Sequence, residues 1–497
     1  MIEATLTSCD IYDIRFLTSK NLDGSDAMHT SPNYSCAYVV IKTNTGHEGY
    51  APSFTLGKGT DILVLAIKTI FDIIKNRTTT YIYNNFAEIW KNLACHPQLR
   101  WLGPEKGIIH TATGAIVNAL WDLWARLENK PLWKLLVDMS PKQLASTIDF
   151  KYISDAINEE EVIEMLEKNM PRKAELEADL RENGYPAYTT QVGWLGYSDE
   201  KIEKLCKEYM DLGFTAFKVK VGKDINDDIR RCAMVRNTIG DENQLMMDAN
   251  QFWETDTAIK NMKLLAPFKP IWIEEPTNPD DEYGHIEVQV ALKKLGIGLA
   301  TGEMFENRLK FKSFLNFRIM DYCQIDASRV GGINEILSIY FMAKRYKIPV
   351  CPHAGGVGLC EMVQHLQMWD YICLSQTKEN RMIEYVDQQH EHFENPVCIK
   401  NACYMPPTLP GYSTKIKDEC IVEYGYPRGT KWQELRRFML PTIPYDQLVD
   451  SIFDNSDYME LYNSPYTSDG SDSDDSDDPD RQRSRPIVKY SLEYLRA

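Results

Sequence analysis

Seven polar residues that could do chemistry recur along the middle of the chain at steps of 23 to 31 residues. Each closes a short apolar run, and the seven are Lys220, Asp248, Glu274, Glu303, Asp326, His353 and Glu384. One step is about the length of a strand–loop–helix–loop unit. In a (β/α)8 barrel the catalytic side chains lie at the carboxyl ends of successive strands and converge on one face. The spacing therefore predicts a barrel whose active site these residues share.

Three consecutive members of the series are carboxylates: Asp248, Glu274 and Glu303. Oxygen ligands suit a hard divalent cation, and Mg²⁺ in particular is held by a few carboxylates while it keeps positions for water or substrate. No nearby cysteine or paired histidine offers the softer ligands of a zinc site. One carboxylate alone would more simply be a surface residue or a helix cap. Three at consecutive barrel steps favour a magnesium site.

Lysine and histidine side chains supply groups for proton transfer. Lys218 and Lys220 are two residues apart in an apolar run, so both side chains point to the same face of a strand. A second cation and a metal ion nearby are expected to lower the pKa of Lys220 and let it act as a base. Asp326, one strand earlier than His353, is expected to orient that histidine and raise its pKa. A base, an acid and a metal suit removal of a proton next to a carboxylate.

The elements that must position these residues follow from the hydrophobic pattern. Residues 1–138 are expected to form an α+β capping domain, with apolar β runs first and helices over 55–136. Residues 139–400 are expected to form the α/β barrel domain, which includes a charged helical excursion at 159–182. The barrel strands are expected at 217–221, 245–248, 271–275, 298–303, 322–326, 348–353 and 382–386.

The C-terminal part of the chain has a different composition. Residues 401–440 are rich in Pro and Gly and are expected to pack back on the cap. The extension 441–497 contains a Ser/Asp-rich stretch, about 463–485, that is expected to be a disordered acidic tail. The serines beside its aspartates leave two interpretations open, a solvated tail and a phosphorylated interaction tail.

Charge and cysteine usage narrow the classes of partner and compartment. The net charge is −17, and seven aspartates within 469–480 supply a large share of it, so we expect no nucleic-acid surface. No apolar run approaches the roughly 18 residues of a membrane span, so no membrane partner is expected. The twelve cysteines are scattered without a CxxC pair and indicate buried thiols in a reducing compartment. The N-terminus lacks a signal or transit pattern, so we expect a cytoplasmic protein.

Short motifs around the series are more specific than its spacing. They are 217–220 (FKVK), 247–250 (MDAN), 273–276 (IEEP), 300–303 (ATGE), 324–326 (QID) and 352–355 (PHAG). As a set they resemble the enolase superfamily in its mandelate-racemase-like branch. Helical segments at 119–123 and 131–135 resemble the capping domain of that branch. Three further segments resemble the L-fuconate dehydratases: 27–30 (AMHT), 98–105 (QLRWLGPE) and 188–197, which ends in GWLGY.

The resemblance, which covers roughly residues 1–440, implies a hydro-lyase that dehydrates an acid sugar with Mg²⁺ as cofactor. It implies that Asp248, Glu274 and Glu303 hold Mg²⁺ and that Lys220 removes the C2 proton. His353, paired with Asp326, would protonate the departing C3 hydroxyl. L-fuconate would give 2-dehydro-3-deoxy-L-fuconate. The implied substrate-binding residues are Gly24, Ser25, Asp26, Tyr34, Lys218, Asn250, His353, Ala354, Gly355 and Glu384.

Other functions stay open, and the enzymes among them share the same first step. A racemase or epimerase, a dehydratase of another aldonic acid, and a non-catalytic regulatory relative are the alternatives. The branch is often oligomeric, so a homo-oligomer is one expectation, while nothing in the sequence identifies a partner for the tail. The animal L-fuconate dehydratases are named for mitochondria, which makes that organelle the alternative to the cytoplasm.

Overall fold

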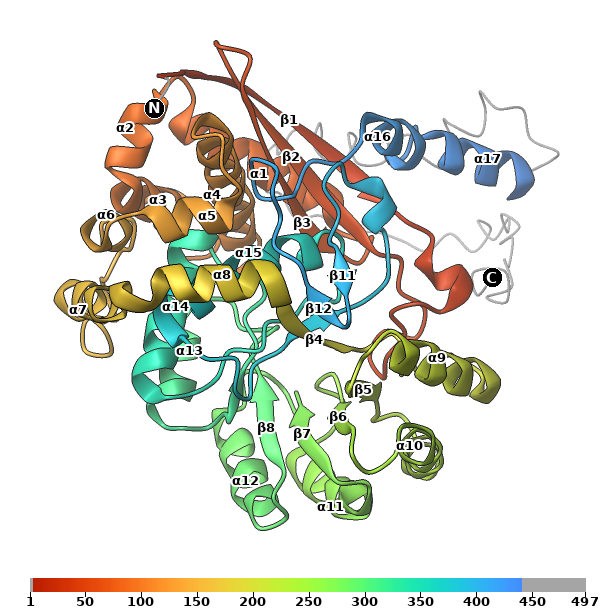
Figure 1. The fold of residues 1–497 in the computed structure, drawn as a ribbon. Helices are drawn as coiled ribbons and strands as arrows, with labels where there is room; N and C mark the ends of the chain where they lie inside the picture. Colours follow the sequence, from red (N-terminus) through yellow and green to blue (C-terminus); the bar gives the residue numbers. More distant parts are fainter. Residues whose placement is uncertain (1–2, 440–497) are drawn as a thin grey trace, which may run out of the picture. The chain divides into compact units, whose positions relative to one another are not determined.

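An antiparallel sheet with helices packed on it forms the capping region (Figure 1). The computed structural model describes residues 3–439. The strands of this sheet are, in spatial order, β1 (Leu6–Arg15), β2 (Ser35–Thr43) and β3 (Glu48–Thr55). The helices of the region are α1 (Thr60–Ile74), α2 (Thr79–Asn84), α3 (Phe86–Ala94), α4 (Gly107–Leu127), α5 (Leu132–Asp138) and α6 (Pro141–Ala145).

Alternate residues of β2 face different cores, as the two-residue period of a strand requires. Val39 and Ile41 belong to the main hydrophobic core, which they share with the helices of the cap and of the barrel. Tyr38 and Val40 belong to a second buried cluster that includes Ile416, from the C-terminal segment. The sheet is therefore covered on both faces, by helices on one and by the returning chain on the other.

Barrel strands and helices alternate after residue 184, and helices α10, α11 and α12 lie outside strands β5 to β8 in Figure 1. The parallel strands are β4 (Tyr185–Thr189), β5 (Ala216–Lys220), β6 (Gln244–Asp248), β7 (Pro270–Glu274), β8 (Gly298–Thr301), β9 (Tyr322–Cys323) and β10 (Ile383–Tyr385). The helices between them are α9 (Asp199–Asp211), α10 (Ile225–Ile239), α11 (Thr255–Leu265), α12 (Glu282–Lys293), α13 (Arg308–Asn316), α14 (Ile333–Tyr346) and α15 (Leu359–Trp369).

Ladder pairing follows the order of a barrel. Strands β4 to β9 pair in sequence order, Cys323 of β9 makes a parallel bridge to Val350, and β10 pairs with β4. The predicted fold class, an α/β (β/α)8-type barrel with an N-terminal α+β capping domain, is confirmed. The predicted charged excursion corresponds to α7 (Glu159–Asn169) and α8 (Lys173–Asn183), which precede β4.

One strand prediction is corrected, and one strand was missed. The run 348–353 forms a single bridge at Val350 because Pro349 and Pro352 lack the N–H groups that a ladder needs. Strand β4 was not predicted, since Pro186 interrupts its apolar run. The ladder accepts this proline because the neighbouring Ala187 supplies the next donor, to the Ala402 carbonyl.

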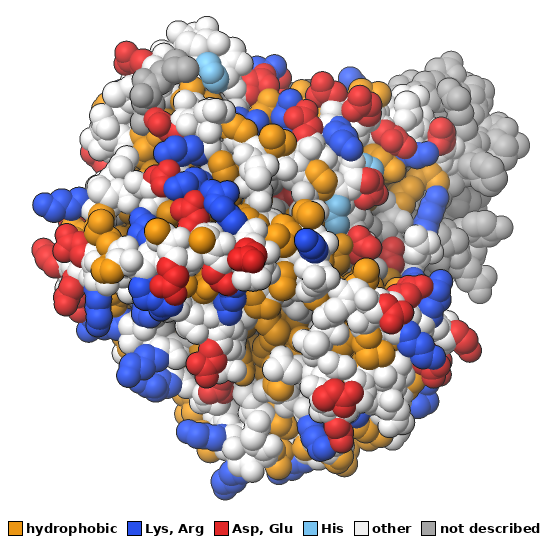
Figure 2. All heavy atoms as spheres, in the orientation of Figure 1, with side chains coloured by type: hydrophobic (Ala, Val, Ile, Leu, Met, Phe, Trp, Pro, Cys, Tyr) orange, Lys and Arg blue, Asp and Glu red, His pale blue; other side chains and the backbone are white. Residues whose placement is uncertain are grey.

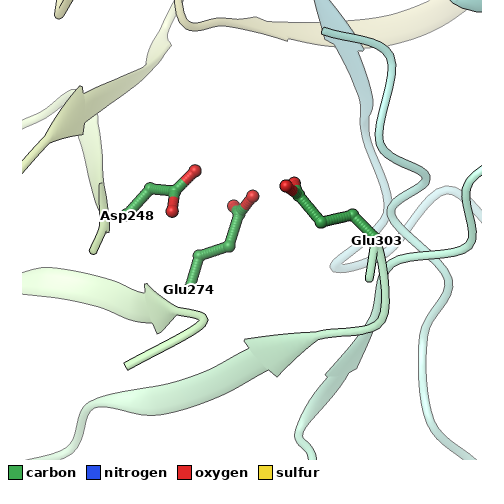
Figure 3. Close-up of side chains that lie close together, drawn as sticks. All are labelled: Asp248, Glu274 and Glu303. Carbon is green, nitrogen blue, oxygen red and sulfur yellow. The ribbon is translucent and has the colours of Figure 1, made fainter. Parts of the chain in front are cut away.

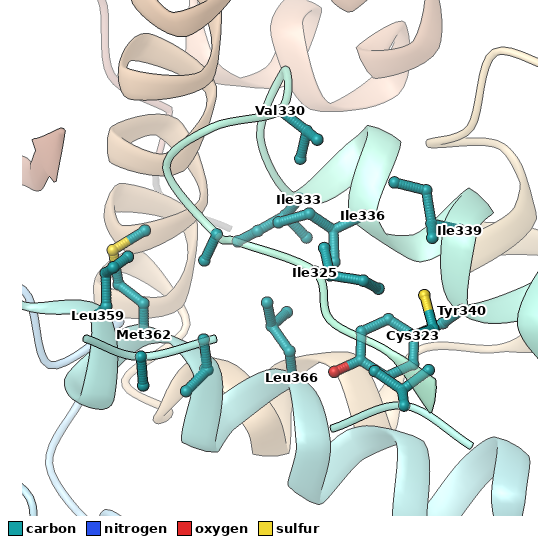
Figure 4. Packing of buried hydrophobic residues seen from close by; sticks show 14 of the residues in the cluster. Cys323, Ile325, Val330, Ile333, Ile336, Ile339, Tyr340, Leu359, Met362 and Leu366 are labelled. Carbon is teal, nitrogen blue, oxygen red and sulfur yellow. The ribbon is translucent and has the colours of Figure 1, made fainter. Parts of the chain in front are cut away.

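Apolar side chains fill the space between the strand region around β9 and helices α14 and α15 (Figure 4). Ile325, Ile336 and Leu366 are 2%, 0% and 2% exposed. Burying each such side chain contributes about 1.5–3 kcal/mol relative to leaving it in water. This packing fixes the segment that carries Asp326 and His353, two members of the predicted catalytic series.

Residues 399–416 connect the barrel to the cap. The short strands β11 (Ile399–Lys400) and β12 (Cys403–Tyr404) extend the barrel sheet antiparallel to β4. The Tyr412 amide then donates to Asp122 of the cap (2.6 Å), and Thr414 donates to the Tyr50 carbonyl (2.6 Å). Helix α16 (Asp418–Tyr424) follows.

A second unit begins at Pro427, and α17 (Thr430–Met439) is its described helix. The predicted extension 441–497 and its acidic stretch 463–485 lie outside the described residues. Within residues 3–439, the structure has no helix that is long and apolar enough to cross a membrane. Figure 2 shows basic side chains interspersed with acidic ones on one face of the molecule.

Candidate active site

The three predicted metal ligands meet at the carboxyl ends of neighbouring strands. Asp248 and Glu274 are the last residues of β6 and β7, and Glu303 lies two residues beyond β8. Each offers a carboxylate oxygen that lies within 4.8 Å of those of the other two. Figure 3 shows the three side chains pointing toward one another. Parallel register, with Asp248 opposite Glu274, sets this arrangement.

The carboxylates fit a divalent cation because all their ligand atoms are oxygens and because two of these oxygens accept no hydrogen bond from the described residues. Glu274 Oε2 and Glu303 Oε2 are buried and have no hydrogen-bond partner among the described residues. Burial and the nearby Asp248 raise the pKa of Glu274 well above its ordinary value. A buried carboxylate oxygen that accepts no hydrogen bond is costly, and oxygen-only ligands suit Mg²⁺. The residues present therefore fit the predicted Mg²⁺.

Lys218 is a counter-ion shared by two of the predicted metal ligands, Asp248 and Glu274, and by Glu384. It is fully buried, and its Nζ lies 2.7 Å from Glu274, 2.9 Å from Glu384 and 3.3 Å from Asp248. Burial opposes its charge, but these carboxylates outweigh burial and raise the pKa of Lys218. Lys218 is not among the described residues that line the cavity, so its contact with a substrate stays a prediction.

Lys220, the predicted base, lies at the end of β5 with its Nζ 2.6 Å from Asp248 Oδ2. The protein's own charges shift the pKa of Lys220 upward, and the lowering expected from a second cation and a metal ion together stays a prediction. Burial opposes the charge and Lys218 repels it, but the attraction of Asp248 outweighs both and raises the pKa of Lys220. The same pairing holds the pKa of Asp248 near 2, although burial alone would raise it.

His353, the predicted acid, is paired as the sequence suggests. Its Nδ1 lies 2.7 Å from Asp326 Oδ2, and its Nε2 lies 3.5 Å from Glu303 Oε2. Burial disfavours the charged ring, but Glu303 and Asp326 outweigh burial and raise the pKa of His353 to about 10. Asp326 is itself fixed by the amide of Ser328 (2.7 Å). The prediction of an oriented histidine with a raised pKa is confirmed.

Glu384 and the segment after His353 complete this side of the site. Glu384 Oε2 accepts from the Ala354 amide at 2.8 Å, and Thr190 donates to its Oε1. Burial opposes ionisation, but Lys218 and His353 lower the pKa of Glu384. A Cβ on Gly355 would lie 3.0 Å from His353 Nε2, so the glycine leaves space beside this ring nitrogen.

A cavity of about 490 Å³ lies above these groups, between the cap and the barrel end. It brings together most of the predicted residues: Gly24, Asp26, Tyr34, Lys220, Asn250, Glu303, Asp326, His353, Gly355 and Glu384. Asn250 Oδ1 is buried without a hydrogen-bond partner among residues 3–439, which leaves it free to accept from a bound molecule. The predicted acid, the predicted base and one predicted metal ligand, Glu303, thus line one cavity. Asp248 and Glu274 are not among its described lining residues.

The cap loop shapes the other wall. Gly24 has φ +80°, and a Cβ there would lie 2.5 Å from the Tyr34 hydroxyl, so the loop requires glycine at this point. Ser25 is 1% exposed and faces the barrel loop, where its Oγ accepts from the Gly196 amide (2.9 Å). Contact of Ser25 and of Ala354 with a substrate stays a prediction, because neither is among the described residues that line the cavity.

Several cavity residues were not predicted. They include His29, Phe54, Trp194, Ser328 and Arg329. Trp194 belongs to the segment 188–197 noted in the sequence, and Arg329 follows Asp326 by three residues. Their closeness to these motifs was the only sequence feature that could have indicated a place in the site. His29 pairs with Asp26 at 3.2 Å, a contact that the loop conformation creates.

Comparison with known families agrees with this geometry. Residues 201–420 match the family described as enolase C-terminal domain-like. Residues 21–137 match the mandelate racemase / muconate lactonizing enzyme N-terminal domain. These two matches cover the barrel from α9 onward and most of the cap.

Full-length relatives are also similar. Mitochondrial enolase superfamily member 1 of Xenopus laevis is 52% identical over 437 residues, which are 88% of this chain and 98% of that protein. L-galactonate dehydratase of Hypocrea jecorina is 45% identical over 87% of this chain and 97% of that protein. The crystal structure of human mitochondrial enolase superfamily member 1 aligns with a TM-score of 0.86 at 50% identity, over 89% of this chain and all of that one. The chain therefore belongs to the enolase superfamily, in the group of mandelate racemase and muconate lactonizing enzyme.

Proposed function

We propose that the protein is a Mg²⁺-dependent acid-sugar dehydratase. The main support is that Lys220 and the Asp326-bound His353 line one cavity. The cluster of three carboxylates links these two residues, since Asp248 pairs with Lys220 and Glu303 pairs with His353. This arrangement supplies a base, an acid and a cation site to one bound molecule. Relatives named as dehydratases support the same reaction class.

The proposed reaction removes water across C2 and C3 of the acid. Lys220 takes the proton from C2, and the electron pair of the broken C–H bond forms the enolate of the carboxylate. Bound Mg²⁺ would supply positive charge that stabilises this enolate and would replace Lys220 as the counter-charge of Asp248. His353 then donates a proton to the C3 hydroxyl as the C3–O bond breaks, and Asp326 stabilises the charged ring beforehand. The enol product tautomerises to a 2-keto-3-deoxy acid.

For the substrate we propose L-fuconate, which would give 2-dehydro-3-deoxy-L-fuconate. The L-galactonate dehydratase relative acts, by its name, on an acid that differs from L-fuconate by one hydroxyl at C6. An apolar pocket rejects an added hydroxyl by only about a hundredfold, so both acids belong in the test. The cytoplasmic location, with the mitochondrion as alternative, stays a prediction.

The test incubates the purified protein and excess Mg²⁺ with a panel of six-carbon aldonic acids and measures 2-keto acid. We expect L-fuconate to give the highest kcat/KM and Lys220→Ala to abolish product formation. Exchange of the C2 hydrogen with D2O without keto acid would favour the racemase or epimerase alternative. Absence of both exchange and keto acid with every member would refute the proposal and favour a non-catalytic relative.

A further inference from the structure

A buried arginine on helix α10 holds the main chain at the predicted base. Arg231 is 2% exposed, and its Nη1 donates to the carbonyl of Lys220 at 2.7 Å. Its Nη2 donates to the carbonyls of Gly193 (2.9 Å) and Trp194 (3.2 Å). Within residues 3–439, no carboxylate lies within ion-pair distance of this guanidinium, so its contacts are with main-chain carbonyls.

The Gly193 and Trp194 carbonyls belong to the loop that follows β4, and the Lys220 carbonyl belongs to the last residue of β5. The Gly193 carbonyl also accepts from the Lys220 amide at 3.0 Å. The same oxygen therefore accepts two hydrogen bonds, one from the Lys220 amide and one from the Arg231 guanidinium. One helical turn earlier on α10, Asp228 Oδ2 accepts from the Gly222 amide at 2.8 Å. Helix α10 therefore contacts the main chain at the last residue of β5 and again two residues beyond it.

The loop that follows β4 forms part of the cavity wall. Trp194 lines the cavity, and Lys220 Nζ lies 5.4 Å from the centre of its ring. Two residues further on, the Gly196 amide donates to Ser25 Oγ, and the Leu195 amide donates to the Ser25 carbonyl at 3.1 Å. One guanidinium thus connects the base, an aromatic wall residue and the loop on which the cap rests.

We propose that Arg231 is a positioning residue that fixes Lys220 relative to C2 of the substrate. This inference rests on the proposed function, in which Lys220 takes the C2 proton. A planar fork with several donors can bind three carbonyls at once, whereas the single ammonium of lysine cannot reproduce that geometry. A misplacement of about 1 Å at a reacting group lowers rates by about a hundredfold.

Arg236, on the same helix, provides a matched control. It is 9% exposed, and it too donates to carbonyls: from Nε to Phe268 at 3.0 Å and from Nη1 to Gly240 and Asn243, both at 2.7 Å. Those carbonyls precede β6 and β7, at the end of the barrel opposite the site. Loss of either arginine removes similar bonds, but only loss of Arg231 releases Lys220.

The experiment compares Arg231→Met, Arg231→Lys, Arg236→Met and Lys220→Ala with the wild type, using an accepted acid sugar and its C2-deuterated form. We expect kcat of R231M to fall by about 10- to 100-fold. Its deuterium isotope effect on kcat should rise, because proton removal becomes slower relative to later steps. R231K should recover part of kcat, and R236M should keep the wild-type isotope effect.

The outcomes separate this inference from the proposed function. R231M with the kcat and isotope effect of R236M would overturn the positioning role. If R231M does not fold, R231K decides by the same isotope effect, and a wild-type value there overturns the role as well. A Lys220→Ala variant that still dehydrates the substrate would overturn the proposed function instead, because the base would then lie elsewhere.

Discussion

Replacing Lys218 by methionine would test the charge balance beneath the cavity. Lys218 is fully buried and lies within 3.3 Å of Asp248, Glu274 and Glu384. Removing one partner of a buried ion pair costs about 3–5 kcal/mol, because the other charge stays buried without compensation. One ammonium group serves three carboxylates here. We therefore expect Lys218→Met to lose at least about 3 kcal/mol of unfolding free energy when no divalent cation is present.

Mg²⁺ should recover part of this loss. It would bring positive charge to the same carboxylates, and in the variant it would no longer meet a repelling ammonium group. A tenfold gain in Mg²⁺ affinity would add about 1.4 kcal/mol of stabilisation at a fixed saturating concentration. The assay is urea unfolding followed by circular dichroism, once with EDTA and once with Mg²⁺, for wild type and variant.

Lys220→Met is the control for this experiment. Lys220 is 5% exposed and forms its ion pair with Asp248, which keeps Lys218 as a second partner. We expect a smaller loss of unfolding free energy and a smaller effect of Mg²⁺. The reasoning is refuted if Lys218→Met unfolds in EDTA at the same urea concentration as the wild type. It is also refuted if Mg²⁺ stabilises the wild type and Lys218→Met equally.

Three further predictions use other parts of the structure. Glu274→Gln should weaken Mg²⁺ binding by about tenfold or more, and an unchanged calorimetric titration would contradict its role as ligand. Glu361 outweighs burial and raises the pKa of His390 to about 9, so their pairing stabilises the fold below about pH 6.5 and this contribution is lost as the pH rises through 9. Glu361→Gln should flatten the unfolding free energy over that window in urea titrations, and an unaltered slope would count against the pair. Gly24→Ala should lower kcat/KM by about tenfold because of the clash with Tyr34, whereas Gly46→Ala, at φ +82° in open space, should not; equal kinetics for both would disprove the clash.

The positions of the catalytic series could be predicted from the sequence because a parallel barrel repeats one local unit. Asp248 and Glu274 end adjacent strands in register, so linear spacing translates directly into proximity. The Asp326–His353 pair was predicted by the same rule, although Asp326 lies three residues beyond β9 and His353 lies three residues beyond the single bridge at Val350. Such predictions hold where strand ends alone determine the position of a side chain.

Features that depend on long-range contacts could not be predicted. Ser25 turns toward the barrel because the Gly196 amide, far away in sequence, needs an acceptor. The direction of the Lys220 pKa shift depends on the 2.6 Å approach of Asp248, which neither the Lys-x-Lys motif nor its apolar neighbours indicate. The role inferred for Arg231 likewise depends on which carbonyls α10 reaches after it packs.

The ion pairs of the site also explain why a divalent cation suits it. Lys218, Lys220 and His353 form one connected network with the carboxylates of Asp248, Glu274, Glu303, Asp326 and Glu384. Five carboxylates and three cations leave an excess of two negative charges when all are ionised. Burial first, and then repulsion by Asp248 and the other nearby carboxylates, raises the pKa of Glu274. A cation with two positive charges balances the network without protonating a ligand. Bound Mg²⁺ would compete with Lys220 for Asp248, so we expect metal binding and deprotonation of the proposed base to be linked through this one carboxylate.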